Sequence, residues 1–136
     1  MLKKDSLTAQ MQQLSHTLAK VKRLMVDGEI VESRKAIKEV LATYYGTSVV
    51  ELIATSVTLF KQQLAQQAFV AEELARLADF LDLRAQLEPD VGNQQALWQK
   101  VILLYDVLEE THQTVSFEHI MRRATIEKLI AQDNKG

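Results

Sequence analysis

Residues that break helices are rare in this chain. Its 136 residues contain four glycines and one proline, and no stretch alternates polar and apolar residues for long enough to form a strand. Gly28, Gly46 and Gly92 each follow or open a segment of helical periodicity, as helix C-caps and turns do. Pro89, in LEPDVGN, ends any helix before it. The sequence therefore predicts a series of helices joined by short connections.

The periodic segments between these turns predict six helices. Because their connections are short, neighbouring helices are expected to be antiparallel. We expect an all-α fold of about six antiparallel helices stacked as helical hairpins, either tetratricopeptide-like or a helical bundle. A single helical domain should cover residues 1–132, followed by a frayed tail over 133–136. The predicted helices cover residues 6–27, 29–45, 49–64, 70–87, 93–111 and 116–132.

The first predicted helix carries a regular apolar seam. Its apolar residues are spaced alternately four and three apart over nearly three heptads, as in coiled coils. Ser6, just before the seam, is a suitable N-cap. Such a seam packs either against another helix of the same chain or against a partner helix. The seam residues are the candidate interface residues: Leu7, Met11, Leu14, Leu18, Val21 and Met25.

The predicted helix over residues 49–64, VVELIATSVTLFKQQL, is apolar on nearly every side. A helix with so little polar surface belongs in the middle of a domain or in an interface. Thr47 or Ser48 is expected to cap its start. The hydroxyl groups around Ser56 can hydrogen-bond to carbonyls one turn earlier, so they need no functional role.

Composition and charge exclude several classes of protein. The absence of cysteine excludes disulfide frameworks, thiolate metal sites and cysteine nucleophiles, and slightly favours a reducing compartment. No run approaches the roughly 20 apolar residues of a membrane span, and no apolar region follows the N-terminal lysines, so we expect a cytoplasmic protein. Residues 1–40 hold eight Lys and Arg against five Asp and Glu, and residues 41–115 hold four against ten. Without a strong basic stripe, we expect neither a nucleic-acid nor a membrane partner.

The stretch LEETHQTVSFEH, residues 108–119, gathers carboxylates and imidazoles. Glu109 and His112 share a helix face at the spacing used in di-iron bundles, but the chain has only one such pair. Ser116 and His119 suggest a nucleophile and its base, yet neither an orienting acid nor a glycine-rich elbow accompanies them. A helix junction explains the stretch more simply, with His112 ending one helix and Ser116 capping the next. We therefore predict no catalytic residue, no metal site and no cofactor.

Two segments read alike, GEIVESRKAI from Gly28 and GNQQALWQKV from Gly92. Each has a glycine and then a small residue, Ser33 or Ala96, as in the close helix crossings of tetratricopeptide repeats. The N-terminal stretch KDSLTAQMQQLSHTLAKVKRLMVDGE resembles a group of small, uncharacterised bacterial helical proteins with tetratricopeptide-like hairpins. That resemblance implies stacked helical hairpins and carries over no activity. Its most similar positions are Asp5, Gln10, Leu14, Leu18, Ala19 and Gly28.

These features favour an interaction protein over an enzyme. The regular seam, the apolar segment over 49–64 and the lack of a catalytic set predict a non-catalytic helical scaffold for protein–protein interaction. A homodimer is its simplest form. The alternative is a small-molecule-binding regulatory protein, with a pocket among the predicted helices over 49–64, 70–87 and 93–111.

Overall fold

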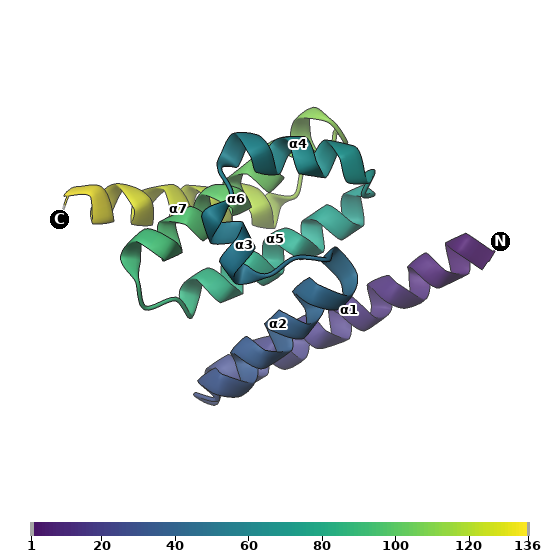
Figure 1. The fold of residues 1–136 in the computed structure, drawn as a ribbon, viewed down its shortest axis with the longest axis horizontal. Coiled ribbons are helices and arrows are strands. Elements are labelled where there is room, and N and C mark those ends of the chain that lie inside the picture. The colour runs from purple at the N-terminus through teal and green to yellow at the C-terminus, as the bar shows by residue number, and fades with distance from the viewer. Residues whose placement is uncertain (1, 136) are drawn as a thin grey trace. The chain divides into compact units, whose positions relative to one another are not determined.

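The computed structural model describes residues 2–135, with side chains from 6 to 134, and this part of the chain contains seven helices and no strand (Figure 1). The expected all-α class is therefore confirmed. No helix in the described range is both long enough and apolar enough to cross a membrane. The helices are α1 (Leu2–Val26), α2 (Ile30–Tyr45), α3 (Val49–Ala54), α4 (Val57–Gln67), α5 (Ala71–Gln86), α6 (Val91–Glu110) and α7 (Phe117–Lys135).

These helices form two compact units, Met1–Glu51 and Leu52–Gly136. The first unit contains α1 and α2, the second contains α4 to α7, and the boundary falls inside α3. Each unit is built around one antiparallel helical hairpin (Figure 1). The prediction of a single domain over residues 1–132 stays a prediction.

In the first unit, α1 and α2 pack against each other as a hairpin. The turn between them uses Gly28, whose φ of 77° lies in the left-handed region where a side chain would be strained. Ile37 and Leu41 of α2 are fully buried. Ser33 is also fully buried, and its hydroxyl donates a hydrogen bond to the Glu29 carbonyl at 2.7 Å. The small residue expected at a close helix crossing therefore lies in the interior.

In the second unit, α5 and α6 form the hairpin, and α4 and α7 pack against α6. Pro89 lies in the connection between α5 and α6, where the sequence predicted a break. Asp90 caps α6 by accepting a hydrogen bond from the Asn93 amide at 2.8 Å. Apolar residues of both helices form the core of this unit. Its buried residues include Leu74, Leu77, Ala78, Phe80, Leu81, Leu97, Val101, Leu104 and Leu108.

The predicted helix over residues 49–64 is wrong in one respect, because two helices occupy this segment. α3 ends at Ala54 and α4 begins at Val57. Ser56 has an extended backbone, and its Oγ accepts a hydrogen bond from the Leu59 amide at 3.1 Å. This serine therefore starts a new helix instead of hydrogen-bonding back by one turn, since its side chain satisfies an amide that a helix start leaves unpaired.

Two predicted helix ends also differ from the structure. α1 begins at Leu2, so Ser6 lies inside the helix and is not its N-cap. No residue between Leu2 and Ser6 breaks a helix, which explains the earlier start. α7 continues past its predicted end to Lys135. The predicted tail over 133–136 is thus helical up to Lys135, and Gly136 lies outside the described residues.

Candidate interaction surface

Large apolar side chains are exposed to solvent at the start of α7. Phe117 is 76% exposed, Met121 57% and Ile120 45%. Together with the exposed Ala124 they are spaced i, i+3, i+4 and i+7, so all four lie on one side of the helix. We call these four residues the α7 apolar face. Val115, 65% exposed in the preceding connection, adds to this apolar surface.

The start of α7 decides which residue stands first on the apolar face. The Ser116 hydroxyl accepts a hydrogen bond from the His119 amide at 3.4 Å, so the predicted N-cap is confirmed. Glu118 lies in the first turn, where a negative charge is favoured by the helix dipole. Both interactions favour a helix that starts at Phe117, which places this phenylalanine at the end of the apolar face.

On the other side of α7, Arg122 pairs with the buried Asp82 of α5. Nε and Nη2 of Arg122 lie 2.6 and 2.8 Å from the two carboxylate oxygens, a bidentate arrangement. Asp82 is only 8% exposed and also accepts a hydrogen bond from Gln86 at 3.2 Å. Hydrogen bonding to Asp82 raises the pKa of the Arg122 guanidinium, which keeps it charged. Removing Arg122 would leave a buried carboxylate without its counter-charge, so this pair favours one orientation of α7.

His119 makes a second contact with α5 and one with α6. Its Nε2 lies 3.3 Å from Oδ1 of Asp79, whose other oxygen accepts a hydrogen bond from Arg76 at 2.8 Å. The His119 ring also stacks on Tyr105 of α6, with ring centroids 4.5 Å apart and planes inclined by 26°. Burial, assisted by the nearby charges of Asp82 and Asp79, raises the pKa of the Tyr105 hydroxyl. This hydroxyl therefore stays protonated at neutral pH.

A third contact joins α7 to α6. Nη1 of Arg123 lies 2.6 Å from Oδ1 of Asp106, and Nη2 lies 3.9 Å from Glu109. The Arg123 guanidinium is also 6.0 Å from the centre of the Tyr105 ring, within reach of a cation–π interaction. Ile126 is fully buried on the same side. Three basic residues and one isoleucine thus attach the first half of α7, and near its end Gln95 of α6 donates a hydrogen bond to Asn134 at 3.2 Å.

Sequence reasoning missed these pairings, although one signal for them is present. Asp79 and Asp82 are three residues apart on α5, and His119 and Arg122 are three residues apart on α7. Each pair lies on one side of its helix, so two carboxylates match two basic groups. Nothing in the sequence shows, however, that these two helices come together.

Within residues 108–119, His119 lies beside a carboxylate and Ser116 caps a helix. The sequence suggested no orienting acid for His119, and the carboxylate of Asp79 shows that this was wrong. The Ser116 hydroxyl, however, accepts from the backbone amide of His119, and among the described residues no hydrogen bond joins it to the imidazole. No group of three or more His, Cys, Asp or Glu residues within the described range could hold a metal ion. The contacts of His119, Arg122 and Arg123 with α5 and α6 attach α7 in the observed orientation.

The seam of α1 falls into two groups. Its middle residues are buried in the chain, whereas those nearer the ends are half-buried. Burial of the middle group supports packing within the chain, and the role of the seam in an interface stays a prediction. The buried residues are Leu14, Leu18 and Val21, and the half-buried ones are Leu7, Met11 and Met25.

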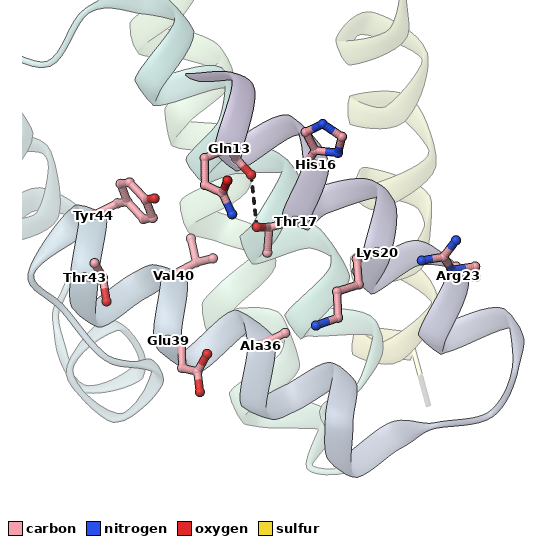
Figure 2. A pocket seen from close by; sticks show the side chains of 10 residues that line it. All are labelled: Gln13, His16, Thr17, Lys20, Arg23, Ala36, Glu39, Val40, Thr43 and Tyr44. Atoms are coloured by element: carbon pink, nitrogen blue, oxygen red, sulfur yellow. Dashed lines mark hydrogen bonds between the residues drawn. The ribbon is translucent and has the colours of Figure 1, made fainter. Parts of the chain in front are cut away.

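An open groove of about 580 Å³ lies between α1 and α2 in the first unit (Figure 2). Lys20 and Arg23 of α1 line it, together with Glu39 of α2, and all three are exposed. The Thr17 hydroxyl in its wall donates a hydrogen bond to the Gln13 carbonyl at 3.0 Å. Because the exposed charges have both signs, the groove gives no clear preference for an anion or a cation.

Comparisons of the chain with protein-family models, curated proteins and solved structures find no match. Within the described residues, ion pairs on one side of α7 leave its apolar face exposed on the other.

Proposed function

We propose that this chain is a non-catalytic helical scaffold for protein–protein interaction that self-associates through the α7 apolar face. The single observation that carries the proposal is the orientation of α7. It turns Phe117, Ile120 and Met121 to solvent, and it turns inward the three basic residues His119, Arg122 and Arg123. Exposed apolar patches of this kind mark interaction sites in proteins. A partner that covers the patch would bury this apolar surface and add hydrophobic stabilisation that the single chain lacks.

The ion pairs explain why the single chain does not bury this face by itself. Turning α7 about its axis would separate Arg122 from Asp82 and Arg123 from Asp106, and would bring the buried Ile126 into water. An uncompensated buried carboxylate costs about 3–5 kcal/mol, and the exposure of Ile126 would cost about 1.5–3 kcal/mol more, so both costs oppose such a turn. The observed orientation is therefore the stable one, and the apolar face stays available.

The pattern of the face favours a second copy of the chain as its partner. When two α7 helices pack antiparallel about a two-fold axis, Phe117 of one copy lies opposite Ala124 of the other, and Ile120 lies opposite Met121. Each large ring thus meets a small residue, which allows close packing of the two helices. Four residues of one helix form a small interface, so we expect a weak dimer with a Kd of about 10–100 µM.

We also propose three properties expected from the sequence: a tetratricopeptide-like arrangement, a bacterial relationship and a cytoplasmic location. The hairpins α1–α2 and α5–α6 support a tetratricopeptide-like arrangement of helical pairs. A bacterial relationship follows from the resemblance of the N-terminal stretch alone. A cytoplasmic location is favoured by the absence of cysteine.

Sedimentation velocity from 2 to 200 µM tests the self-association. The wild-type chain should shift from monomer to dimer over this range, and Ile120→Glu should stay monomeric because it places a charge in the apolar face. Val31→Glu is the matched control, since Val31 is a 75% exposed apolar residue on α2. It should dimerise like the wild type.

Two results would contradict the proposal. A wild-type chain that remains monomeric at 200 µM would exclude a second copy as the occupant. A dimer that persists in Ile120→Glu but is lost in Val31→Glu would place the interface on α2 instead of α7.

A further inference from the structure

A second feature, independent of self-association, is an apolar cavity in the second unit. It has a volume of about 200 Å³ and lies among α4, the start of α5 and the end of α6. These are the three segments among which the sequence predicted a pocket. An apolar cavity of about 150 Å³ is large enough to take benzene in a well-studied engineered protein, so this one has room for a substituted six-membered ring.

The inner wall of the cavity cannot form hydrogen bonds through its side chains. Leu64 of α4, Leu74 of α5 and Val107 of α6 are all buried and line it, and the half-buried Phe69 forms another part of the wall. A polar group placed against this wall would lose its hydrogen bonds to water without replacement. The wall therefore selects the apolar body of a ligand.

The rim of the cavity has the opposite character. Lys61 of α4 and His112, just after α6, both line it. Among the described residues, neither side chain takes part in a hydrogen bond or an ion pair. A lysine ammonium and an imidazole at the mouth of an apolar cavity form a suitable site for one carboxylate.

Two helices, α4 and α6, end at the cavity. Ala68 and Gln113 are the two non-glycine residues with positive φ in the described range, at 53° and 51°. Ala68 lines the cavity, and Gln113 directly follows His112. Both residues end a helix, since Ala68 is the left-handed C-cap of α4 and the Thr114 amide donates to the Leu108 carbonyl at 2.9 Å across Gln113. The two helix ends therefore position residues that line the cavity.

We propose that this cavity binds a small apolar monocarboxylate of about the size of benzoate. The ring lies against Leu64, Leu74 and Val107, and the carboxylate lies at the rim beside Lys61 and His112. A carboxylate is favoured over a neutral group because its hydrogen bond to the Lys61 ammonium is charge-assisted, and a cationic group would be repelled by Lys61.

Ligand-observed NMR and calorimetric titration test the proposal with three matched probes: benzoate, benzamide and benzylamine. Benzoate should bind with a Kd on the order of 1 mM, as expected for a ligand of this size. Benzamide should bind about fivefold more weakly, because it lacks the charge, and benzylamine more weakly still. Lys61→Gln should weaken benzoate about fivefold and leave benzamide unchanged, whereas the exposed Lys128→Gln should change neither.

A second variant tests the cavity itself. Ala65 lines the cavity on α4 and is exposed to solvent, so Ala65→Leu should fill the space and abolish benzoate binding without unfolding the chain. Gln66→Leu, at an exposed neighbouring position outside the cavity, is the control and should bind benzoate normally. Melting curves from circular dichroism confirm that each variant is folded.

Three outcomes would overturn the assignment. Equal affinity for benzoate and benzamide would show that the rim charges play no part. Unchanged benzoate binding in Ala65→Leu would place the ligand elsewhere. An absence of benzoate binding at 20 mM, together with weaker self-association in Ala65→Leu, would show that the cavity receives a side chain of a partner copy instead.

Discussion

α1 and α7 turn opposite kinds of side chain toward their neighbours. α1 buries Leu14, Leu18 and Val21, as an amphipathic helix is expected to do. Its charged residues Lys20, Lys22 and Arg23 are exposed to water. α7 turns Arg122 and Arg123 toward carboxylates and leaves Phe117 and its apolar neighbours exposed. The apolar stripe of a helix therefore does not by itself decide which side faces the protein. The partner helices decide, and here α5 presents carboxylates.

The largest effect should come from shortening a buried side chain of α1. Leu14 is 1% exposed, so Leu14→Ala removes buried apolar surface and leaves a cavity. We expect a loss of about 3 kcal/mol in the free energy of unfolding, measured by urea titration followed by circular dichroism. A loss below about 1 kcal/mol would mean that the seam is not tightly packed, and the contrast with α7 would disappear.

Removal of the arginine and removal of the aspartate from the ion pair between α5 and α7 should destabilise the chain by different amounts. Arg122→Ala leaves the buried Asp82 with Gln86 as its one hydrogen-bond donor among the described side chains, so we expect a loss of about 2–3 kcal/mol. Asp82→Ala leaves an arginine whose side chain is 30% exposed and can be hydrated, so the loss should be about 1–2 kcal/mol. Urea titration of both variants and of the double variant measures the difference. Equal losses would mean that Asp82 is hydrated and does not fix the orientation of α7.

Lys100 provides a test of buried charge on α6, because no ion pair to it is found among residues 6–134. This residue is only 2% exposed, and burial lowers the pKa of its ammonium. Lys100→Met should therefore stabilise the chain by about 1 kcal/mol at pH 7, which corresponds to a rise of about 4 °C in melting temperature. Melting of both proteins at several pH values measures this gain.

The pH dependence of the same variant has a defined sign. Because the pKa of Lys100 is lower in the folded chain, the unfolded chain binds more protons as the pH approaches the ordinary lysine value. Wild-type stability should therefore gain a contribution as the pH rises from 7 toward 10, and the advantage of Lys100→Met should shrink. If the extra stability of Lys100→Met over the wild type stays constant from pH 7 to 10, it comes from packing alone and not from the buried charge.

Features set by local sequence were predicted well. The serine caps at Ser48 and Ser116, the left-handed glycines at Gly28 and Gly46, and the break at Pro89 are all confirmed. Each depends on a few neighbouring residues whose backbone preference or hydrogen bonding is local. The split of the segment over residues 49–64 was missed, although a serine cap signalled it. In that segment the apolar pattern continues through the break, so periodicity alone favoured one helix.

The candidate site was harder to predict because it depends on long-range contacts. The pairing of Asp79 and Asp82 with His119 and Arg122 joins residues 40 positions apart in the chain. Nothing in the periodicity of α7 shows that its basic side is the attached one. The apolar positions of this helix were visible in the sequence, but their exposure follows only once the carboxylates of α5 are placed beside it.

Phe117→Ala should have the smallest effect on the free energy of unfolding, and it distinguishes α7 from α1 most clearly. Phe117→Ala makes a larger truncation than Leu14→Ala, yet Phe117 is 76% exposed, so at 2 µM the free energy of unfolding should change by less than about 0.5 kcal/mol. Self-association stabilises the folded chain by mass action, so the melting temperature of the wild type should rise between 2 and 200 µM. That rise should be absent in Phe117→Ala. If the variant instead loses stability at both concentrations, Phe117 packs within the single chain, and α7 would be held like α1, by buried apolar side chains.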